Sequence, residues 1–509
     1  MRGIATCPRC ASTFFKGWNL TETTEKNSQQ RQDTLHVVVI GAGPAGLTAA
    51  IEAQRAAATV TVVEQSDKCG GISRTEVYKG FRFDMGGHRF YSKSSLVETF
   101  WRETLGEDFL ERDRLSRIFY RNRFFSYPLK PIETLLKLGP IECLRVITSL
   151  LWWKLFPYPQ ENTFEEWVTN RFGRRLFRTF FKTYTEKVWG ISCTELKAEW
   201  AAQRIKGLSL KVVLYSMFAR PRTTVRTLIE QFYYPRLGPG MMWEAVAKRV
   251  ERAGGQLVYN SPVTRIETDG AHAVKAVVVS SAGRESMVVG SHFIASMPIT
   301  DLVRAMTPQP PADVLHAAEQ LRYRDFLTVC LIIRRKDIFK DNWIYIHEPA
   351  VLVGRIQNYG NWSPEMVPDP EKTSLGLEYF CNKGDDVWCS SDSDLIQRAG
   401  RELEVLRLAS AADVVDGCVF RVEKSYPVYD SDYRQYLAVL RQYVERFSNL
   451  QMVGRNGLHR YNNQDHAMLT GILASRKLLL GENHDVWSVN SDQEYLEEQS
   501  RPAEPEVTR

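Results

Sequence analysis

The segment from residue 36 to residue 64 constrains the fold more than any other part of the sequence. A β-branched run, HVVVI, leads directly into Gly41-Ala-Gly43-Pro-Ala-Gly46, which opens an alanine-rich helix. The first glycine permits a tight turn, the second lets the backbone approach a pyrophosphate, and the third lets the helix pack closely. Glu64 ends the next strand, about 20 residues further on, where a carboxylate can hold both ribose hydroxyls of an adenosine. The sequence therefore predicts an α/β fold with a Rossmann-like domain that binds an adenine dinucleotide.

Length and composition limit the class of protein. The chain has 509 residues, and single cores stop growing near ~250 to 300 residues, so we expect two or three domains. Apolar residues at 44% and charged residues at 25% exclude a disordered, collagen-like or coiled-coil chain. The net charge of +6 comes without the dense basic patches of nucleic-acid binders, so we expect no nucleic-acid partner.

Cysteine usage bears on location and on metal binding. The nine cysteines have no regular spacing, which argues against a disulfide framework and for a reducing, cytoplasmic location. Cys7 and Cys10 form half of a zinc-knuckle pattern, and since no second pair lies nearby, we predict no metal site. The N-terminus lacks an apolar run behind basic residues, which argues against secretion.

Changes of pattern along the chain suggest how it is divided. The predicted parts are a flexible extension at 1–34, a discontinuous Rossmann-like domain at 35–92, 235–320 and 445–485, a largely helical domain at 93–234, a second, substrate-binding sheet at 321–444, and a polar tail at 486–509. Charged residues interrupt the most apolar stretch, 140–158, so it is no spanning helix. We interpret it as a buried helix of the middle domain, with an amphipathic membrane anchor as the alternative.

A second glycine-rich segment indicates which dinucleotide is bound. Gly70-Gly71 and Arg74 follow the predicted ribose acid, and the loop DMGGHRF with Gly87 and His88 comes next. The glycine pair lets main chain approach a second phosphate, and the arginine can neutralise pyrophosphate charge. These motifs resemble the FAD-binding superfamily that includes amine oxidases and protoporphyrinogen oxidase. No second GxGxxG unit follows, which disfavours a built-in NAD(P)H domain.

Three blocks resemble the UDP-galactopyranose mutase family in particular. They are DMGGHRFYSK, YTEKVWG at 184–190, and the closing loop GRNGLHRYNNQD at 454–465. The resemblance implies non-covalent FAD, active when reduced, with His88 and Arg455 beside the flavin and the helix that starts at Gln464 and Asp465 aimed at its ring. It also implies substrate contacts from Tyr184, Trp189, Arg355, Tyr426 and Tyr461. On that basis His88, Arg455 and Tyr461 are the candidate catalytic residues.

The residues alone leave purely structural roles open for these positions. His88 could merely pack, the 184–190 block could be an aromatic core helix, and Arg355 could be a surface charge. The sequence also departs from the mutase pattern, because Leu208 stands where the family carries a mobile-loop arginine, between Lys206 and Lys211. Asn463 replaces the expected aspartate of the final loop.

The resemblance implies a redox-neutral interconversion of pyranose and furanose forms of a nucleotide-linked sugar through a reduced-flavin N5 adduct, in cell-surface polysaccharide biosynthesis. It requires an external reductant. The alternative is an oxidoreductase of the amine oxidase or protoporphyrinogen oxidase type, including one that acts on a lipid-linked substrate at a membrane surface. An oligomer is compatible with either.

Overall fold

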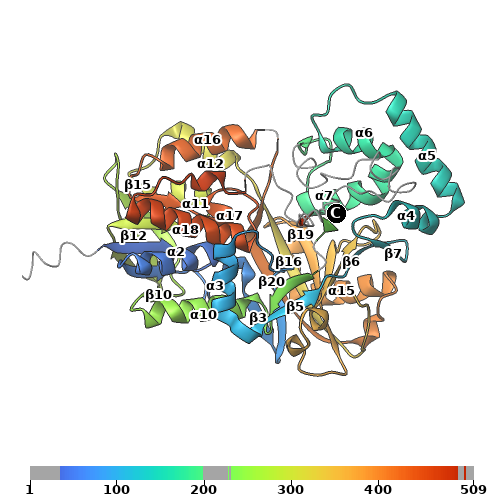
Figure 1. The fold of residues 1–509 in the computed structure, drawn as a ribbon, viewed down its shortest axis with the longest axis horizontal. Helices are drawn as coiled ribbons and strands as arrows, with labels where there is room; N and C mark the ends of the chain where they lie inside the picture. The colour runs from blue at the N-terminus through green and yellow to red at the C-terminus, as the bar shows by residue number, and fades with distance from the viewer. Residues whose placement is uncertain (1–34, 199–226, 229–230, 431, 491–497, 500–509) are drawn as a thin grey trace, which may run out of the picture.

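The computed structural model describes residues 35–198, 227–228, 231–430, 432–490 and 498–499. Cys7, Cys10 and the segment around Leu208 lie outside these residues, so the predictions made for them stay predictions. Figure 1 shows a parallel sheet with its helices on the left, a helical body at the upper right, and a second sheet below that body.

The first sheet is parallel and buried, as the β-branched runs predict. Its order is β10 (Gln256–Val258), β2 (Thr59–Val63), β1 (His36–Ile40), β14 (His292–Ala295) and β21 (Leu450–Met452). The helices α2 (Pro44–Arg55), α10 (Pro239–Arg252) and α18 (Gln464–Leu480) pack around it. A Cβ on Gly471 of α18 would lie 2.3 Å from the Ala45 carbonyl oxygen, so this glycine lets α18 cross α2 closely. The predicted α/β class is confirmed.

The second sheet is mostly antiparallel. Its order is β20 (Val414–Pro427), β16 (Tyr323–Ile333), β19 (Thr373–Cys381), β18 (Arg355–Asn358), β17 (Trp343–Ile346), β6 (Ser116–Tyr120) and β7 (Arg123–Ser126). The last two strands, β6 and β7, come from the segment predicted to be largely helical. They join the second sheet through the parallel pairing of β6 with β17. The helix α15 (Asp392–Val405) packs on β16 and β20.

Smaller elements connect these layers. A four-stranded sheet contains β11 (Val263–Thr268), β12 (Val274–Ser281), β13 (Arg284–Val289) and β15 (Met306–Thr307), and β3 (Thr75–Tyr78) pairs with β4 (Phe81–Asp84), β5 (Phe109–Asp113) with β9 (Gln231–Pro235), and β8 (Thr227–Leu228) with β22 (Glu498–Gln499). The other helices are α3 (Ser95–Leu105), α4 (Pro131–Leu138), α5 (Pro140–Leu155), α6 (Phe164–Phe177), α7 (Thr183–Trp189), α11 (Ile299–Arg304), α12 (Ala312–Gln320), α13 (Tyr359–Trp362), α14 (Asp386–Cys389), α16 (Tyr433–Val444) and α17 (Gly454–Gly457).

The expectation that the 140–158 stretch forms a buried helix is wrong. Residues 140–155 do form the helix α5, but Val146 is its buried residue, while Leu151 is 58% exposed and Leu155 is 73% exposed. Among the described residues α5 packs against α6 and α4, and these apolar side chains on its remaining face stay exposed. Within the described residues, no helix has the length and hydropathy needed to cross a bilayer.

Candidate functional site

The first glycine turn forms at the end of β1, where the sequence predicts it. Gly41 has φ +99°, which a side chain would strain, and a Cβ on Gly46 would lie 1.9 Å from the Gly41 carbonyl oxygen. Gly43 is the N-cap of α2, and no side chain of the described chain caps that end of the helix. The first amides of α2 and the positive end of its dipole are therefore available to an anion.

Glu64 lies beside this turn at the end of β2. Its Oε2 accepts a hydrogen bond of 2.7 Å from the Ala42 amide, and its Oε1 accepts bonds from the Ser66 amide and hydroxyl. The carboxylate is buried, so its position is fixed. A fixed acceptor next to the glycine turn fits the adenosine ribose of a dinucleotide.

The second glycine turn faces the first. Gly70 and Gly71 both have positive φ, and a Cβ on Gly71 would lie 3.3 Å from the Gly43 Cα. Backbone therefore approaches backbone, as a bound pyrophosphate requires. Arg74 Nε pairs with Glu76 Oε1 at 2.6 Å, so the charge that we expected to neutralise pyrophosphate is already partnered. These two turns, with Glu64, are the residues that would hold the adenosine and pyrophosphate of FAD.

His88 and Arg455 come from opposite ends of the sequence. A Cβ on Gly86 would lie 3.8 Å from His88 Nε2 and 3.9 Å from Arg355 Nη2, so the histidine and this second arginine lie close together. Burial lowers the pKa of His88 to about 4, and Arg455 and Arg355 act in the same direction. The imidazole is therefore neutral at pH 7. Its Nε2 lies 2.7 Å from the Met85 carbonyl oxygen, which requires the proton on that nitrogen.

The closing loop positions Arg455 and begins α18. Arg455 Nε donates to the Asn462 carbonyl at 2.9 Å and Nη1 donates to the Ser425 carbonyl at 3.0 Å. At the start of α18, Gln464 accepts a bond from Trp243 Nε1, while its own buried Nε2 has no partner among the described residues. Burial raises the pKa of the neighbouring Asp465. A buried amide donor without a partner at a helix N-terminus suits the polar edge of a cofactor ring.

The predicted substrate residues come together although they lie on separate elements. Tyr426 and Tyr461 stack with ring centroids 5.5 Å apart, and the Arg455 guanidinium lies 4.5 Å from the Tyr461 ring centroid. Trp189, at the end of α7, meets Tyr426 edge to face at 6.4 Å. Arg355 Nη2 lies 3.5 Å from the Tyr426 hydroxyl. We call this set the Tyr–Arg cluster; its members are Tyr184, Trp189, Arg355, Tyr426, Arg455 and Tyr461.

Tyr184 and Trp189 reach the cluster because α7 is fixed against the second sheet, as Figure 1 shows. Tyr184 stacks on His347 with centroids 5.0 Å apart. Lys187 turns inward and donates to the carbonyls of Glu348 at 2.8 Å and Val353 at 3.1 Å. Burial lowers the pKa of Lys187 to about 8.

Sequence reasoning missed Glu378. This carboxylate is fully buried on β19, directly opposite Arg355 of β18 in the strand register. Its Oε2 accepts from both Nε and Nη2 of Arg355, and its Oε1 accepts from Gln357 Nε2 at 2.8 Å. A glutamate within the otherwise apolar run SLGLEYF was the available signal. The pair leaves Arg355 with little net charge to offer an anion.

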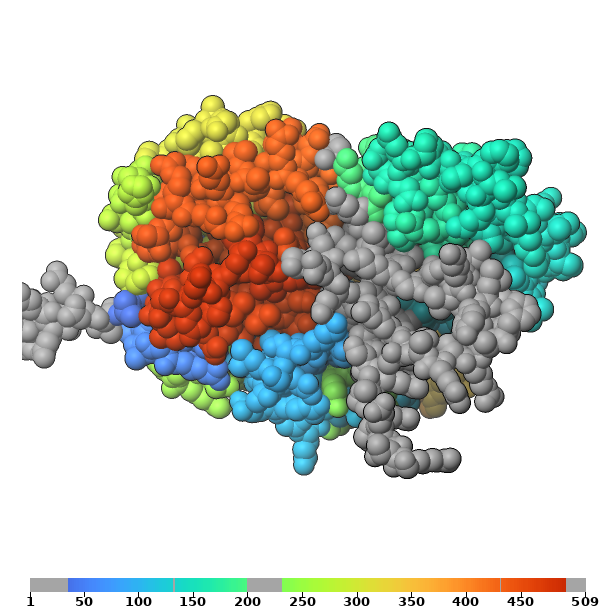
Figure 2. Space-filling view, turned by 45° about the horizontal axis from the view of Figure 1, so that its top comes forward, coloured from blue at the N-terminus to red at the C-terminus, as the bar shows by residue number. Residues whose placement is uncertain are grey.

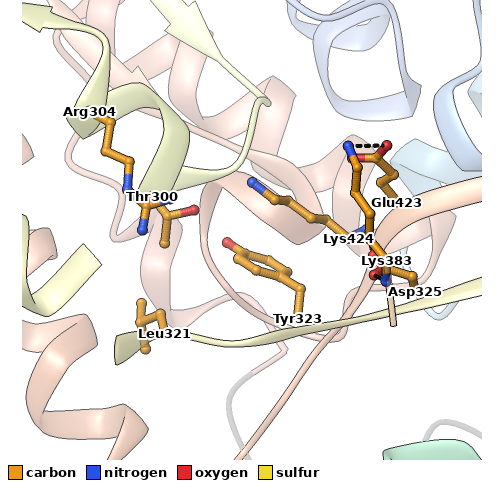
Figure 3. Close-up of a pocket in the computed structure, with 8 residues that line it drawn as sticks. All are labelled: Thr300, Arg304, Leu321, Tyr323, Asp325, Lys383, Glu423 and Lys424. Carbon is orange, nitrogen blue, oxygen red and sulfur yellow. Dashed lines mark hydrogen bonds and ion pairs between the residues drawn. The ribbon is translucent and has the colours of Figure 1, made fainter. Parts of the chain in front are cut away.

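A polar pocket is lined by residues of α11, β16 and β20, with Lys383 beside them (Figure 3). Three basic side chains line it, but each is near a carboxylate. Lys383 pairs with Glu423 at 2.8 Å, Lys424 pairs with Asp301 at 2.5 Å, and Arg304 lies 3.8 Å from the same aspartate. This balance gives the pocket no preference for an anion, so we do not place the substrate there.

A family model described as flavin-containing amine oxidoreductase matches residues 44–479. This range begins just after Gly43 and includes Gly46, the second glycine turn, the His88 loop and the closing loop. The chain belongs to the flavin-containing amine oxidoreductase family. It is an FAD-dependent flavoenzyme of the amine oxidase superfamily, and the two glycine turns fit that cofactor.

Curated relatives match parts of the chain. An inactive all-trans-retinol 13,14-reductase of Danio rerio is 23% identical over 57% of this chain and 52% of its own length. L-amino acid oxidase Cdc18 of Crotalus durissus cumanensis is 34% identical over 19% of this chain and 22% of its own length. The matches thus span about half, or less, of these relatives.

Solved structures match the fold over most of the chain. Reduced UDP-galactopyranose mutase superposes with a TM-score of 0.79 at 22% identity, covering 90% of this chain and 98% of the mutase. A putative protoporphyrinogen oxidase from Exiguobacterium sp. gives a TM-score of 0.67 at 16% identity, covering 88% of this chain and 100% of the oxidase. At these identities the likeness establishes the fold.

Proposed function

We propose that this flavoenzyme interconverts pyranose and furanose forms of a nucleotide-linked sugar. The observation that supports the proposal is the Tyr–Arg cluster, which gathers phenols, guanidinium groups and an indole from separate elements beside the His88 loop. Such groups are suited to binding a diphosphate and an adjoining base.

The phenols of the cluster are hydrogen-bond donors at neutral pH. Burial raises the pKa of Tyr184 well above its ordinary value and also raises that of Tyr426. Both groups keep their protons, so each can donate to a phosphate oxygen. Trp189 offers a stacking face to the base, as the mutase resemblance implies.

The charges of the cluster favour an anion only modestly. Arg455 is held by two carbonyls and has no carboxylate partner among the described residues, whereas Glu378 balances Arg355. A sugar-nucleotide diphosphate carries two negative charges. We propose that Arg455 meets one of them and that phosphate binding draws Arg355 partly away from Glu378 to meet the other.

When bound and reduced, FAD supplies an electron-rich ring nitrogen that can act as a nucleophile toward a sugar carbon. The protein supplies the environment. His88 is neutral, so it adds no positive charge to that of Arg455 at the edge of the flavin ring. The N-terminus of α18 favours negative charge on the same ring. An external reductant is the partner that this function requires.

An oxidation of the amine oxidase type is the second candidate. What favours it is that curated relatives with matching segments include L-amino acid oxidases and a phytoene dehydrogenase of Streptomyces griseus, which is 42% identical over 18% of this chain. The Arg355–Glu378 pair also weakens the case for a diphosphate.

Turnover distinguishes the two. UDP-galactopyranose is incubated with the dithionite-reduced protein, products are separated by chromatography, and oxygen uptake is followed in parallel without dithionite. A furanose product that depends on reduction supports the proposal. Peroxide formed with amines or amino acids, and no furanose product, rejects it.

A further inference from the structure

The outer surface of the helical body carries an unusual set of exposed apolar side chains. On α5 these recur at helical spacing, so Leu144, Ile147, Leu151 and Leu155 form one stripe, and they are 64%, 42%, 58% and 73% exposed. Trp152 lies beside the stripe and Leu136 lies on the neighbouring α4, 59% and 76% exposed. We call these six residues the α5 face. Soluble monomers seldom expose so many large apolar groups on one helix.

The opposite side of α5 is packed against α6, and this packing holds the α5 face toward the surface. A Cβ on Gly173 of α6 would lie 2.9 Å from the Leu150 Cα, which shows how closely the two helices cross. The Arg175 amide donates to Ser149 Oγ at 3.1 Å, and its guanidinium pairs with Glu142 at 2.6 Å. In Figure 1 α5 lies on the outer rim, and in Figure 2 the helical body forms a lobe at the upper right.

The charges around the α5 face select its partner. Residues 130–158 contain four basic and two acidic side chains. Glu133 pairs with Lys137, and Glu142 is partly buried and pairs with both Arg145 and Arg175, whereas the Arg145 side chain is 61% exposed. A second copy of the chain would bring the same positive border against itself. An anionic surface complements it.

We propose that the α5 face docks on an anionic lipid bilayer, with the apolar stripe inserted at the level of the headgroups. The helix is 16 residues long, or about 24 Å, which suits a helix lying in the plane of the interface. Trp152 contacts Phe156 at its end, with centroids 4.7 Å apart, and aromatic rings are favoured at that depth. The docking is independent of the proposed function, because it uses none of the Tyr–Arg cluster.

Vesicle co-sedimentation of the FAD-loaded protein tests the proposal. Phosphatidylcholine vesicles with and without phosphatidylglycerol are compared for the wild type, for Leu151→Ser/Leu155→Ser, and for the control Met287→Ser/Val289→Ser. The control removes two apolar side chains that are 60% and 62% exposed on β13, far from α5 in sequence. Flavin absorbance and the melting temperature confirm that each variant is folded and loaded.

We expect the wild type to bind the phosphatidylglycerol vesicles, and the α5 variant to lose at least about tenfold in partition coefficient while the control keeps its binding. Arg145→Gln should bind more weakly, and added salt should weaken the wild type. No binding by the wild type, equal binding by all variants, or equal binding with and without phosphatidylglycerol would each overturn the proposal. A dimer would also overturn it, if sedimentation velocity without lipid shows that the wild type is dimeric, the α5 substitutions dissociate the dimer, and the wild type does not bind vesicles. The α5 face would then be an interface between two copies of the chain.

Discussion

Glu378→Gln tests whether Arg355 binds the diphosphate of the substrate. The substitution removes a fully buried charge and leaves the guanidinium, whose side chain is 16% exposed, without its counter-ion. Breaking a buried pair from one side costs about 3–5 kcal/mol, so we expect a melting temperature lower by several degrees. A diphosphate that contacts Arg355 would supply the missing negative charge. We therefore expect the variant to bind UDP about tenfold more tightly than the wild type, since about 1.4 kcal/mol of the lost pairing is recovered on binding.

The assay is a flavin fluorescence titration with UDP, run with thermal melts in the presence and absence of nucleotide. Glu402→Gln is the matched control, because Glu402 is also buried but accepts from the Leu352 and Val353 amides and from the Tyr379 hydroxyl rather than from an arginine. It should lower the melting temperature without changing UDP affinity. If Glu378→Gln is destabilised and binds UDP no better than the wild type, Arg355 does not face the phosphates and our reasoning about the cluster is refuted.

Three further predictions concern the cofactor, the cluster and acid stability. Gly43→Ala should fold, because its Cβ meets only an ordinary contact at 3.8 Å, but it should lose FAD affinity because the methyl group fills the gap between the glycine turns. Gly46→Ala should fail to fold, because its Cβ would lie 1.9 Å from a carbonyl oxygen. The yield and flavin content of the purified proteins check both. Tyr429→Phe removes the hydroxyl that accepts the Tyr461 amide at 2.6 Å, so we expect UDP affinity to fall about threefold to tenfold with FAD content unchanged; unchanged UDP affinity would contradict this. Burial lowers the pKa of His459 to about 4, below its ordinary 6.5, so the unfolded state takes up the proton first and stability is lost as pH falls from about 6.5 to 4, by up to about 3 kcal/mol. His459→Phe should make the fall of melting temperature over that range shallower but not abolish it, because His88 also has a pKa near 4 and keeps its own contribution. An unaltered pH profile would contradict the contribution of His459.

The cofactor half of the protein could be predicted from sequence because it depends on local backbone geometry. Gly41 and Gly46 occupy positions where any Cβ would strain or collide, so the residue type itself reports the turn. β14 lies in the 235–320 segment that we assigned to the Rossmann-like domain, and it pairs in parallel with β1. The domain boundaries stay a prediction.

The substrate half depends on contacts between distant segments, which local patterns do not encode. The motif resemblance named the members of the Tyr–Arg cluster, and the structure brings them together, yet their roles stay predictions. Glu378 was missed because its partner follows from the pairing register of β18 with β19. The exposure of α5 was missed because apolar content alone does not say which faces of a helix neighbours cover.

The measurement that tests the central claim most directly is a titration of UDP against the flavin of the purified wild type, in its oxidised and reduced states. We predict a yellow protein whose flavin signal responds to UDP, and responds more strongly in the reduced state, because the Tyr–Arg cluster lies beside the His88 loop, which we expect to contact the flavin. A colourless protein that cannot be reconstituted with FAD would contradict the cofactor assignment. A yellow protein whose flavin ignores UDP in both states would contradict the nucleotide site.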